Sequence, residues 1–163
     1  MSRRSSVRWF SLGLTLIGFL WFYLPDCSKK TPEDQVRAAI QAVADGLGEA
    51  RLDHALAPLS PAYQDEEGFD AATVRAVLFR ELQSRGPIHV VMGAVDVQIA
   101  PDGEHAEARF SALALDGLNP AALDLRANNA QAWAFTVDLA QEDGDWRITS
   151  HTRRDVQPQD VFQ

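Results

Sequence analysis

The sequence predicts an α+β domain in which helices come first and an antiparallel sheet, covered on one face, follows them. A hydrophobic N-terminal helix precedes this domain. Two observations carry the prediction. After Pro87 the hydrophobic period changes from that of a helix to the two-residue alternation of a strand. The later segments are joined by tight-turn signals, which link antiparallel neighbours.

The first 30 residues are expected to form a signal or anchor segment. Arg3, Arg4 and Arg8 precede an uncharged run at 9–24, which would span about 24 Å as a helix, slightly less than a hydrocarbon core of about 30 Å. Basic residues ahead of such a run favour a cytoplasmic amino end. We therefore expect residues 7–24 to contact a membrane, and the body to face the periplasm of a bacterial cell envelope.

Three outcomes are open for this segment. The residues at the end of the apolar run are not the small residues that signal peptidase prefers, which disfavours cleavage and release of a soluble form. Residues 24–27 resemble a lipobox through Leu24, three places before Cys27, but depart from it at Asp26, so lipidation at Cys27 and an uncleaved anchor are the alternatives. Cys27 could also be an idle thiol. Because it is the only cysteine, no internal disulfide is possible.

The charge of the chain is unevenly divided. The first 30 residues carry five Lys or Arg and one acid, whereas the remaining 133 carry ten bases and 22 acids, a balance of −12. An acidic body repels a polyanion, so nucleic acid is excluded as a main partner. A hydrophobic content of 46% is typical of a folded domain rather than a disordered one.

Three helices are expected before Pro87. The first has Thr31 as its cap and Pro32 at its first position, and Gly46 and Gly48 weaken its end. A short second helix covers 51–59, and 61–68 is turn-like. Asp70 can cap the third, which Gly86 and Pro87 end. The apolar stripes are Val36, Ala39, Ile40, Val43 and Leu47; Leu52, Leu56 and Leu59; and Phe69, Val74, Val77, Leu78 and Leu82.

Four strands are expected next, at 88–100, 106–114, 133–139 and 146–150. Residues 101–103 form a turn, 117–131 a long connection, and 142–145 a tight hairpin. The domain is therefore expected to cover 31–154, with 155–163 as a tail.

This order resembles the nuclear transport factor 2-like superfamily, whose cone-shaped fold is shared by ketosteroid isomerase, scytalone dehydratase and the SnoaL-like proteins. The resemblance rests on Gly-Glu-Ala-Arg-Leu-Asp-His-Ala-Leu at 48–56, on 59–63, and on the closing Asp-Gly-Asp-Trp-Arg-Ile at 143–148. It covers 31 to about 154. It implies three helices closing a strongly curved, cystatin-like sheet around a conical pocket, often with dimers through the outer sheet face. It implies no single activity.

His89 is the candidate for acid–base chemistry, because the pKa of histidine lies near neutrality. It is expected to face the core with Val91 and Val95, unless Gly93 forms a bulge. The alternative is a structural histidine near the end of the sheet, whose ring nitrogens form hydrogen bonds with backbone groups or water. His151 is expected on the polar outer face, beside Arg153.

An apolar pocket is expected to be lined by Tyr63, His89, Phe110 and Trp133, with Tyr63 as a hydrogen-bond donor; plain core packing is the alternative. Asp53 and His54 could be read as an acid–base pair, but side chains at neighbouring helix positions point in different directions. The pocket carboxylates and histidines of ketosteroid isomerase and scytalone dehydratase have no residue-by-residue match.

No cofactor and no metal is expected, because the sequence lacks phosphate-loop, nucleophile-elbow, zinc-helix and paired-cysteine motifs. The acids at 65–67 and 142–145 lack the ligand spacing of a calcium loop and are typical of solvated turns. Ile88, Val90 and Met92 would make the outer face of the first strand apolar, which suggests a homodimer.

Two functions follow as predictions. The first is a non-catalytic cell-envelope domain that binds a small apolar ligand or a protein partner. The second is a small-molecule isomerase, dehydratase or hydrolase in which His89 carries the proton.

Overall fold

The computed structural model describes residues 30–116 and 130–162. The first helix, α1 (Pro32–Gly48), begins where predicted, because the Thr31 hydroxyl accepts a hydrogen bond from the Asp34 amide at 3.2 Å. It continues through Gly46 and Gly48 without a break. The second helix, α2 (Leu52–Leu56), is shorter than the predicted 51–59. It ends early because Leu59 already bridges to Ile148 of the last strand.

The third helix, α3 (Ala71–Arg85), has the predicted ends. Asp70 accepts a hydrogen bond from the Thr73 amide at 2.8 Å, and Gly86, with φ of 78°, terminates the helix. None of its residues is buried. The predicted apolar stripe of α3 is therefore only partly covered: Val74 packs against the inner core, whereas Val77 remains 41% exposed.

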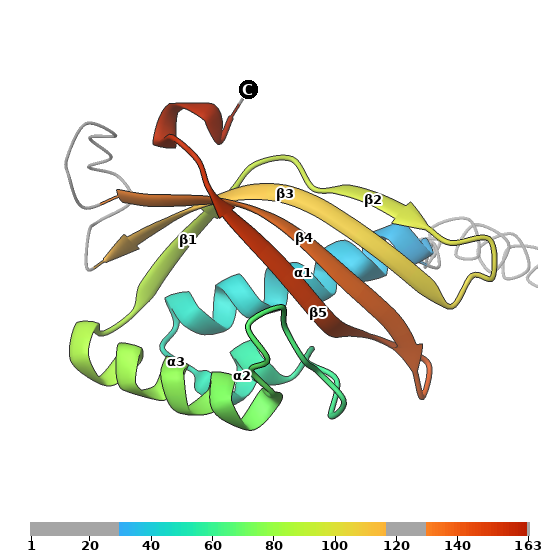
Figure 1. The fold of residues 1–163 in the computed structure, drawn as a ribbon, viewed down its shortest axis with the longest axis horizontal. Helices are drawn as coiled ribbons and strands as arrows, with labels where there is room; N and C mark the ends of the chain where they lie inside the picture. Colours follow the sequence, from blue (N-terminus) through green and yellow to red (C-terminus); the bar gives the residue numbers. More distant parts are fainter. Residues whose placement is uncertain (1–29, 117–129, 163) are drawn as a thin grey trace, which may run out of the picture.

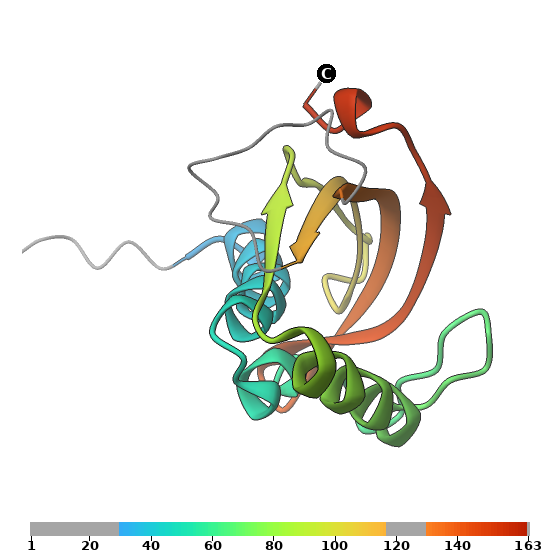
Figure 2. The same cartoon turned by 90° about the vertical axis from the view of Figure 1, so that its left-hand side faces the viewer.

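The sheet has five antiparallel strands, β1 (Ile88–Met92), β2 (Asp96–Ile99), β3 (His105–Asp116), β4 (Ala130–Glu142) and β5 (Asp145–Asp155). Their order is β1-β3-β4-β5. β1 pairs with residues 112–116 of β3, and β2 pairs with residues 106–109 of the same strand. Asp143 and Gly144, both with positive φ, make the predicted two-residue hairpin between β4 and β5. The sheet curls over the helices, and α3 lies at the far end of the curl from the C-terminus (Figures 1 and 2).

The main hydrophobic core lies between α1 and the concave face of the sheet. On β3, alternation places Ala106 and Ala108 on this inner face and Leu113 and Leu115 on the outer face. The buried residues of the inner core are Val36, Ile40, Tyr63, Ala106, Ala108, Val137, Leu139, Trp146 and Ile148. The fold class predicted from the sequence is thus confirmed, with helices packed on a curved antiparallel sheet.

The predicted strand 88–100 is two strands. Three residues, 93–95, separate Met92 from Asp96, whereas only two separate their β3 partners, Ala112 and Arg109. This extra residue reverses the alternation, since a shift of one residue moves side chains to the opposite face. Val91 packs on the outer cluster and Val95 on the inner core.

The expectation that Met92 faces outward with Ile88 and Val90 is therefore wrong, because Met92 packs against the inner core. Gly93 still bonds in register with Ser111, so the extra residue lies just after it, and the need for glycine here comes from the C-terminal segment. A Cβ at this position would lie 2.5 Å from the carbonyl oxygen of Val161.

The residues after β5 pack on the outer face of the sheet. The Val156 amide donates to the Ala132 carbonyl at 3.1 Å, and a 3-10 turn, η3 (Pro158–Asp160), follows. Val161 is 4% exposed and packs with Leu113 and Leu115. Figure 1 shows this segment on the opposite side of the sheet from the helices. Part of the outer apolar surface is thus covered by the chain itself, and the homodimer stays a prediction.

Several sequence predictions lie outside the described residues. These are the anchor at 7–24, Cys27, and almost all of the connection at 117–131. Within 30–116 and 130–162, no helix is long and apolar enough to cross a membrane.

Candidate functional site

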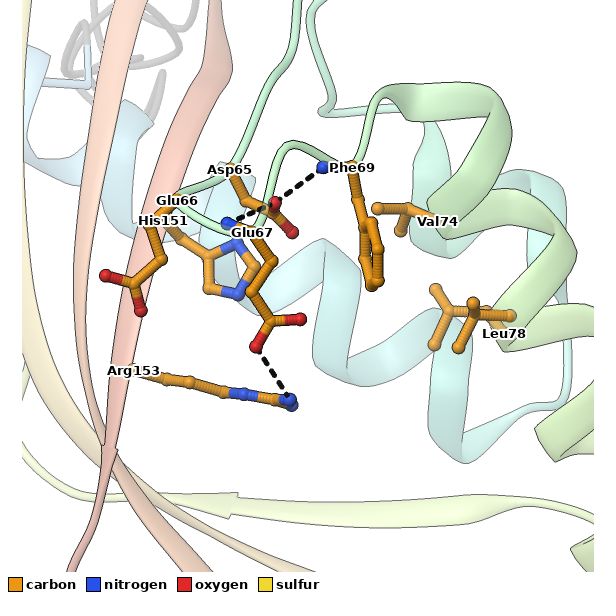
Figure 3. A pocket seen from close by; sticks show the side chains of 9 residues that line it. Asp65, Glu66, Glu67, Phe69, Val74, Leu78, His151 and Arg153 are labelled. Atoms are coloured by element: carbon orange, nitrogen blue, oxygen red, sulfur yellow. Dashed lines mark hydrogen bonds and ion pairs between the residues drawn. The ribbon is translucent and has the colours of Figure 1, made fainter.

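A pocket of about 210 Å³ lies between α3, the turn at 65–69 and β5 (Figure 3). One wall is apolar and comes from α3 and Phe69, and the opposite wall carries the polar side chains of β5. The lining residues are Asp65, Glu66, Glu67, Phe69, Val74, Val77, Leu78, His151 and Arg153. This pocket explains why α3 has an apolar stripe and no buried residue: part of the stripe faces the pocket.

The turn at 65–69 is held by its first carboxylate. Asp65 Oδ1 accepts hydrogen bonds from the amides of Glu67 at 3.0 Å and Phe69 at 2.8 Å, which is an Asx-type turn. The turn is also joined to β5, because Glu67 forms an ion pair with Arg153 at 3.7 Å. The acids at 65–67 thus form a surface turn, as predicted, and this turn places Phe69 over the pocket (Figure 3).

The segment before this turn bonds to β5 at two points, on either side of a tight turn in which the Tyr63 amide donates to the Ser60 carbonyl at 3.1 Å. The Ser60 amide donates to the Ile148 carbonyl at 2.8 Å, and the Gln64 amide donates to the Thr149 carbonyl at 3.0 Å. These bonds hold Tyr63 against His151. The Tyr63 hydroxyl lies 2.5 Å from His151 Nδ1, and the two rings stack with centroids 6.1 Å apart.

A bulge in β5 turns His151 toward the interior. Leu139 pairs with Ile148 but Asp138 pairs with Ser150, so Thr149 is one extra residue in β5. Beyond it the alternation is reversed, and His151 pairs with Val137 of the inner core. The prediction that His151 lies on the polar outer face is therefore wrong. The regular alternation of Arg147, Thr149 and His151 that supported it is interrupted at Thr149.

His151 connects the predicted pocket aromatics into one row. Its ring lies 6.0 Å from that of Phe135, which stacks on Phe110 at 5.3 Å and lies 6.4 Å from Trp133. Tyr63, Phe110 and Trp133, which the sequence predicts together, are thus linked on the inner face, but none of them lines the pocket between α3 and β5. The linking residues, His151 and Phe135, were missed as site residues.

The two polar groups of this row are both neutral at neutral pH. Burial raises the pKa of Tyr63 from 10.0 to about 12, and the nearby Asp65 carboxylate acts in the same direction. Burial also lowers the pKa of His151 below its usual value of 6.5, against the opposing effect of Asp65. Of this uncharged pair, His151 lines the pocket, opposite the apolar wall, and Tyr63 lies behind it.

His89 occupies a different place. It pairs with Leu115, and its Nδ1 lies 3.8 Å from the point where a Cβ on Gly48 would be, at the end of α1. It does not line the pocket at β5. His89 as a proton carrier stays a prediction, in a location separate from Tyr63, Phe110 and Trp133.

The remaining polar candidates lie apart from the pocket. Asp53 forms an ion pair with Arg75 of α3 at 2.8 Å. His54 Nδ1 lies 3.6 Å from a Glu49 carboxylate oxygen, which is too long for a hydrogen bond, and this buried nitrogen has no hydrogen-bond partner among the described residues. No group of three or more potential metal ligands occurs in the part of the chain that the structure describes.

Comparison with known proteins identifies the fold. Neither protein-family models nor curated protein sequences match the chain. A Caulobacter vibrioides protein with a cystatin-like fold is similar in structure, with a TM-score of 0.62 and 14% identity over 78% of this chain and 92% of its own. A Streptomyces avermitilis protein, provisionally named a dehydratase of the NTF2-like family, has a TM-score of 0.61 and 16% identity over 77% and 96%.

A longer Bdellovibrio bacteriovorus protein also matches, with a TM-score of 0.62 and 6% identity, over 76% of this chain and 40% of its own. These neighbours confirm the predicted nuclear transport factor 2-like, cystatin-like fold. At such low identities they establish the fold alone.

Proposed function

We propose that this chain is a non-catalytic domain of the bacterial cell envelope that binds a small, largely apolar ligand. The observation that carries the proposal is the pocket between α3 and β5, whose apolar wall includes Phe69, Val74 and Leu78. Its volume of about 210 Å³ is below the range of about 300–1,000 Å³ typical of drug-sized ligands. The ligand is therefore expected to be small, on the scale of one substituted ring.

The location rests on the sequence. A basic tip followed by the apolar run at 9–24 favours retention at a membrane with the acidic body on the outer side. A protein partner is the other occupant that the apolar surface of α3 could take. The pocket favours a small ligand, because a hollow between α3 and β5 matches a compact molecule better than a flat protein surface.

The experiment tests ligand binding by filling the pocket with a larger side chain on α3. Leu78→Trp places an indole in the space that Leu78 lines, whereas Phe79→Trp adds the same group at the next position, which is 52% exposed and does not line the pocket. Acetophenone serves as the probe, titrated into the full-length chain and followed by NMR. We expect Leu78→Trp to weaken binding at least tenfold and Phe79→Trp to leave it unchanged. Equal binding by both variants, or no binding to the wild type, would contradict the proposal.

A second function is favoured by one specific observation, the 2.5 Å contact between Tyr63 and His151. A neutral imidazole with a hydrogen-bonded phenol can move protons, so an isomerase, dehydratase or hydrolase is the alternative. In that case His151→Gln, whose amide oxygen can still accept the Tyr63 hydrogen bond but which cannot carry a proton, would abolish a turnover found by substrate screening. His89→Ala tests the sequence-based candidate in the same assay.

A further inference from the structure

The contact between Tyr63 and His151 determines where the imidazole proton lies. Tyr63 is 4% exposed, and in the described part of the chain its hydroxyl contacts no hydrogen-bonding group other than His151 Nδ1. A buried hydroxyl that donates to nothing costs about 1–3 kcal/mol. The hydroxyl therefore donates, and Nδ1 accepts.

The neutral imidazole then carries its proton on Nε2, because one ring nitrogen is a donor when the other is an acceptor. Within residues 30–116 and 130–162, the structure gives His151 no hydrogen bond other than the one to Tyr63. Figure 3 shows the ring projecting from β5 between the turn at 65–69 and Arg153, at the polar side of the pocket. His151 thus offers an N–H donor that a bound molecule can use.

The surrounding charges limit what can accept this hydrogen bond. Three carboxylates, from Asp65, Glu66 and Glu67, line the same pocket, and the cation Arg153 is already paired with Glu67. An anionic acceptor would be repelled by the unpaired carboxylates. A neutral oxygen avoids this cost while its apolar body contacts Phe69, Val74 and Leu78.

We propose that the pocket selects neutral ligands with a hydrogen-bond acceptor, such as a ketone, ester or amide oxygen, on an apolar body. This inference rests on the proposed function and specifies its ligand class. His151 is the donor, and Tyr63 is a positioning residue that holds the imidazole in the Nε2–H form.

The first test needs no ligand. The imidazole nitrogen NMR shifts of the full-length chain at neutral pH should show His151 protonated on Nε2. His105 provides an internal contrast, because its Nδ1 lies 2.8 Å from an Asp102 carboxylate oxygen, which can only accept. Tyr63→Phe should shift His151 toward a mixture of the two forms and leave His105 unchanged. A wild-type His151 protonated on Nδ1 would overturn the inference.

The second test compares acetophenone with α-methylstyrene, which has the same shape and no acceptor. We expect acetophenone to bind the wild type roughly three- to tenfold more tightly, the range that one neutral hydrogen bond allows. His151→Phe should remove this preference, and His151→Gln, which keeps an amide donor, should retain part of it. Equal affinity for both probes in the wild type would refute the ligand class and leave the proposed function standing. Binding of neither probe would refute the proposed function itself.

Discussion

Gly46 and Gly48 provide a sharp test of how α1 meets α2. Helix propensity treats them alike, since replacing glycine by alanine inside a helix stabilises it by about 1 kcal/mol. In the structure, the two glycines have different surroundings. A Cβ on Gly46 would lie 2.3 Å from the backbone nitrogen of Ala55 and 2.6 Å from its Cα, whereas the nearest atom to a Cβ on Gly48 is 3.8 Å away. Ala55 is fully buried in α2.

Gly46→Ala must therefore push α2 away from α1. Overpacking of this kind costs about 1–3 kcal/mol, and here the obstructing atoms are backbone, which cannot turn aside as a flexible side chain can. Because the propensity gain is similar in the two variants, their difference isolates the packing term. We expect Gly48→Ala to be neutral or slightly stabilising and Gly46→Ala to be less stable than Gly48→Ala by roughly 1–3 kcal/mol.

The assay is urea unfolding of the full-length variants, followed by tryptophan fluorescence, because Trp146 lies in the inner core. The free energies of unfolding are compared at a common slope with denaturant. If Gly46→Ala proved as stable as Gly48→Ala, the close approach of α1 and α2 would be wrong.

Two further predictions concern the site and the outer face. Burial raises the pKa of Tyr63 to about 12 in the folded chain, compared with 10.0 in the unfolded chain. The stabilisation of the fold that comes from this pKa difference is complete below pH 10 and is lost as the pH rises toward 12. By pH 11 the loss should be about 1 kcal/mol in the wild type, with this step absent from Tyr63→Phe, measured by urea unfolding; identical alkaline profiles would count against the burial of Tyr63. Val161→Asp should lower the free energy of unfolding by about 2 kcal/mol, whereas Phe162→Asp, at a position 53% exposed, should change it by less than about 0.5 kcal/mol. Equal effects at the two positions would show that residues 156–162 do not pack on the sheet.

The parts of the fold that the sequence predicted correctly depend on short-range physics. Thr31 and Asp70 cap their helices through amides three residues away, and Asp143 and Gly144 form the hairpin turn. The change of hydrophobic period after Pro87 separates helices from strands. Each of these signals involves neighbouring residues, so the order of elements and the fold class were accessible without any tertiary information.

The faces of the strands were harder to predict, because one inserted residue exchanges the two faces of everything beyond it. Between Gly93 and Asp96 the insertion reversed the expected sides of Met92 and Val91, and at Thr149 it brought His151 inward. The first insertion has a weak signal in the neighbouring Gly93, a glycine within a strand. Thr149 gives no such signal, and sequence alternation alone therefore placed His151 on the wrong face.

The sequence by itself thus determined the class of the domain, the start of α1, both ends of α3 and aromatic residues of its interior. Only the tertiary structure decided which polar groups join them. The bulge at Thr149 presents its carbonyl to the amide of Gln64, and the same stretch of chain brings Tyr63 to His151, 88 residues away. A contact over that separation forms because two distant backbones pair, and no local pattern of residues encodes that pairing.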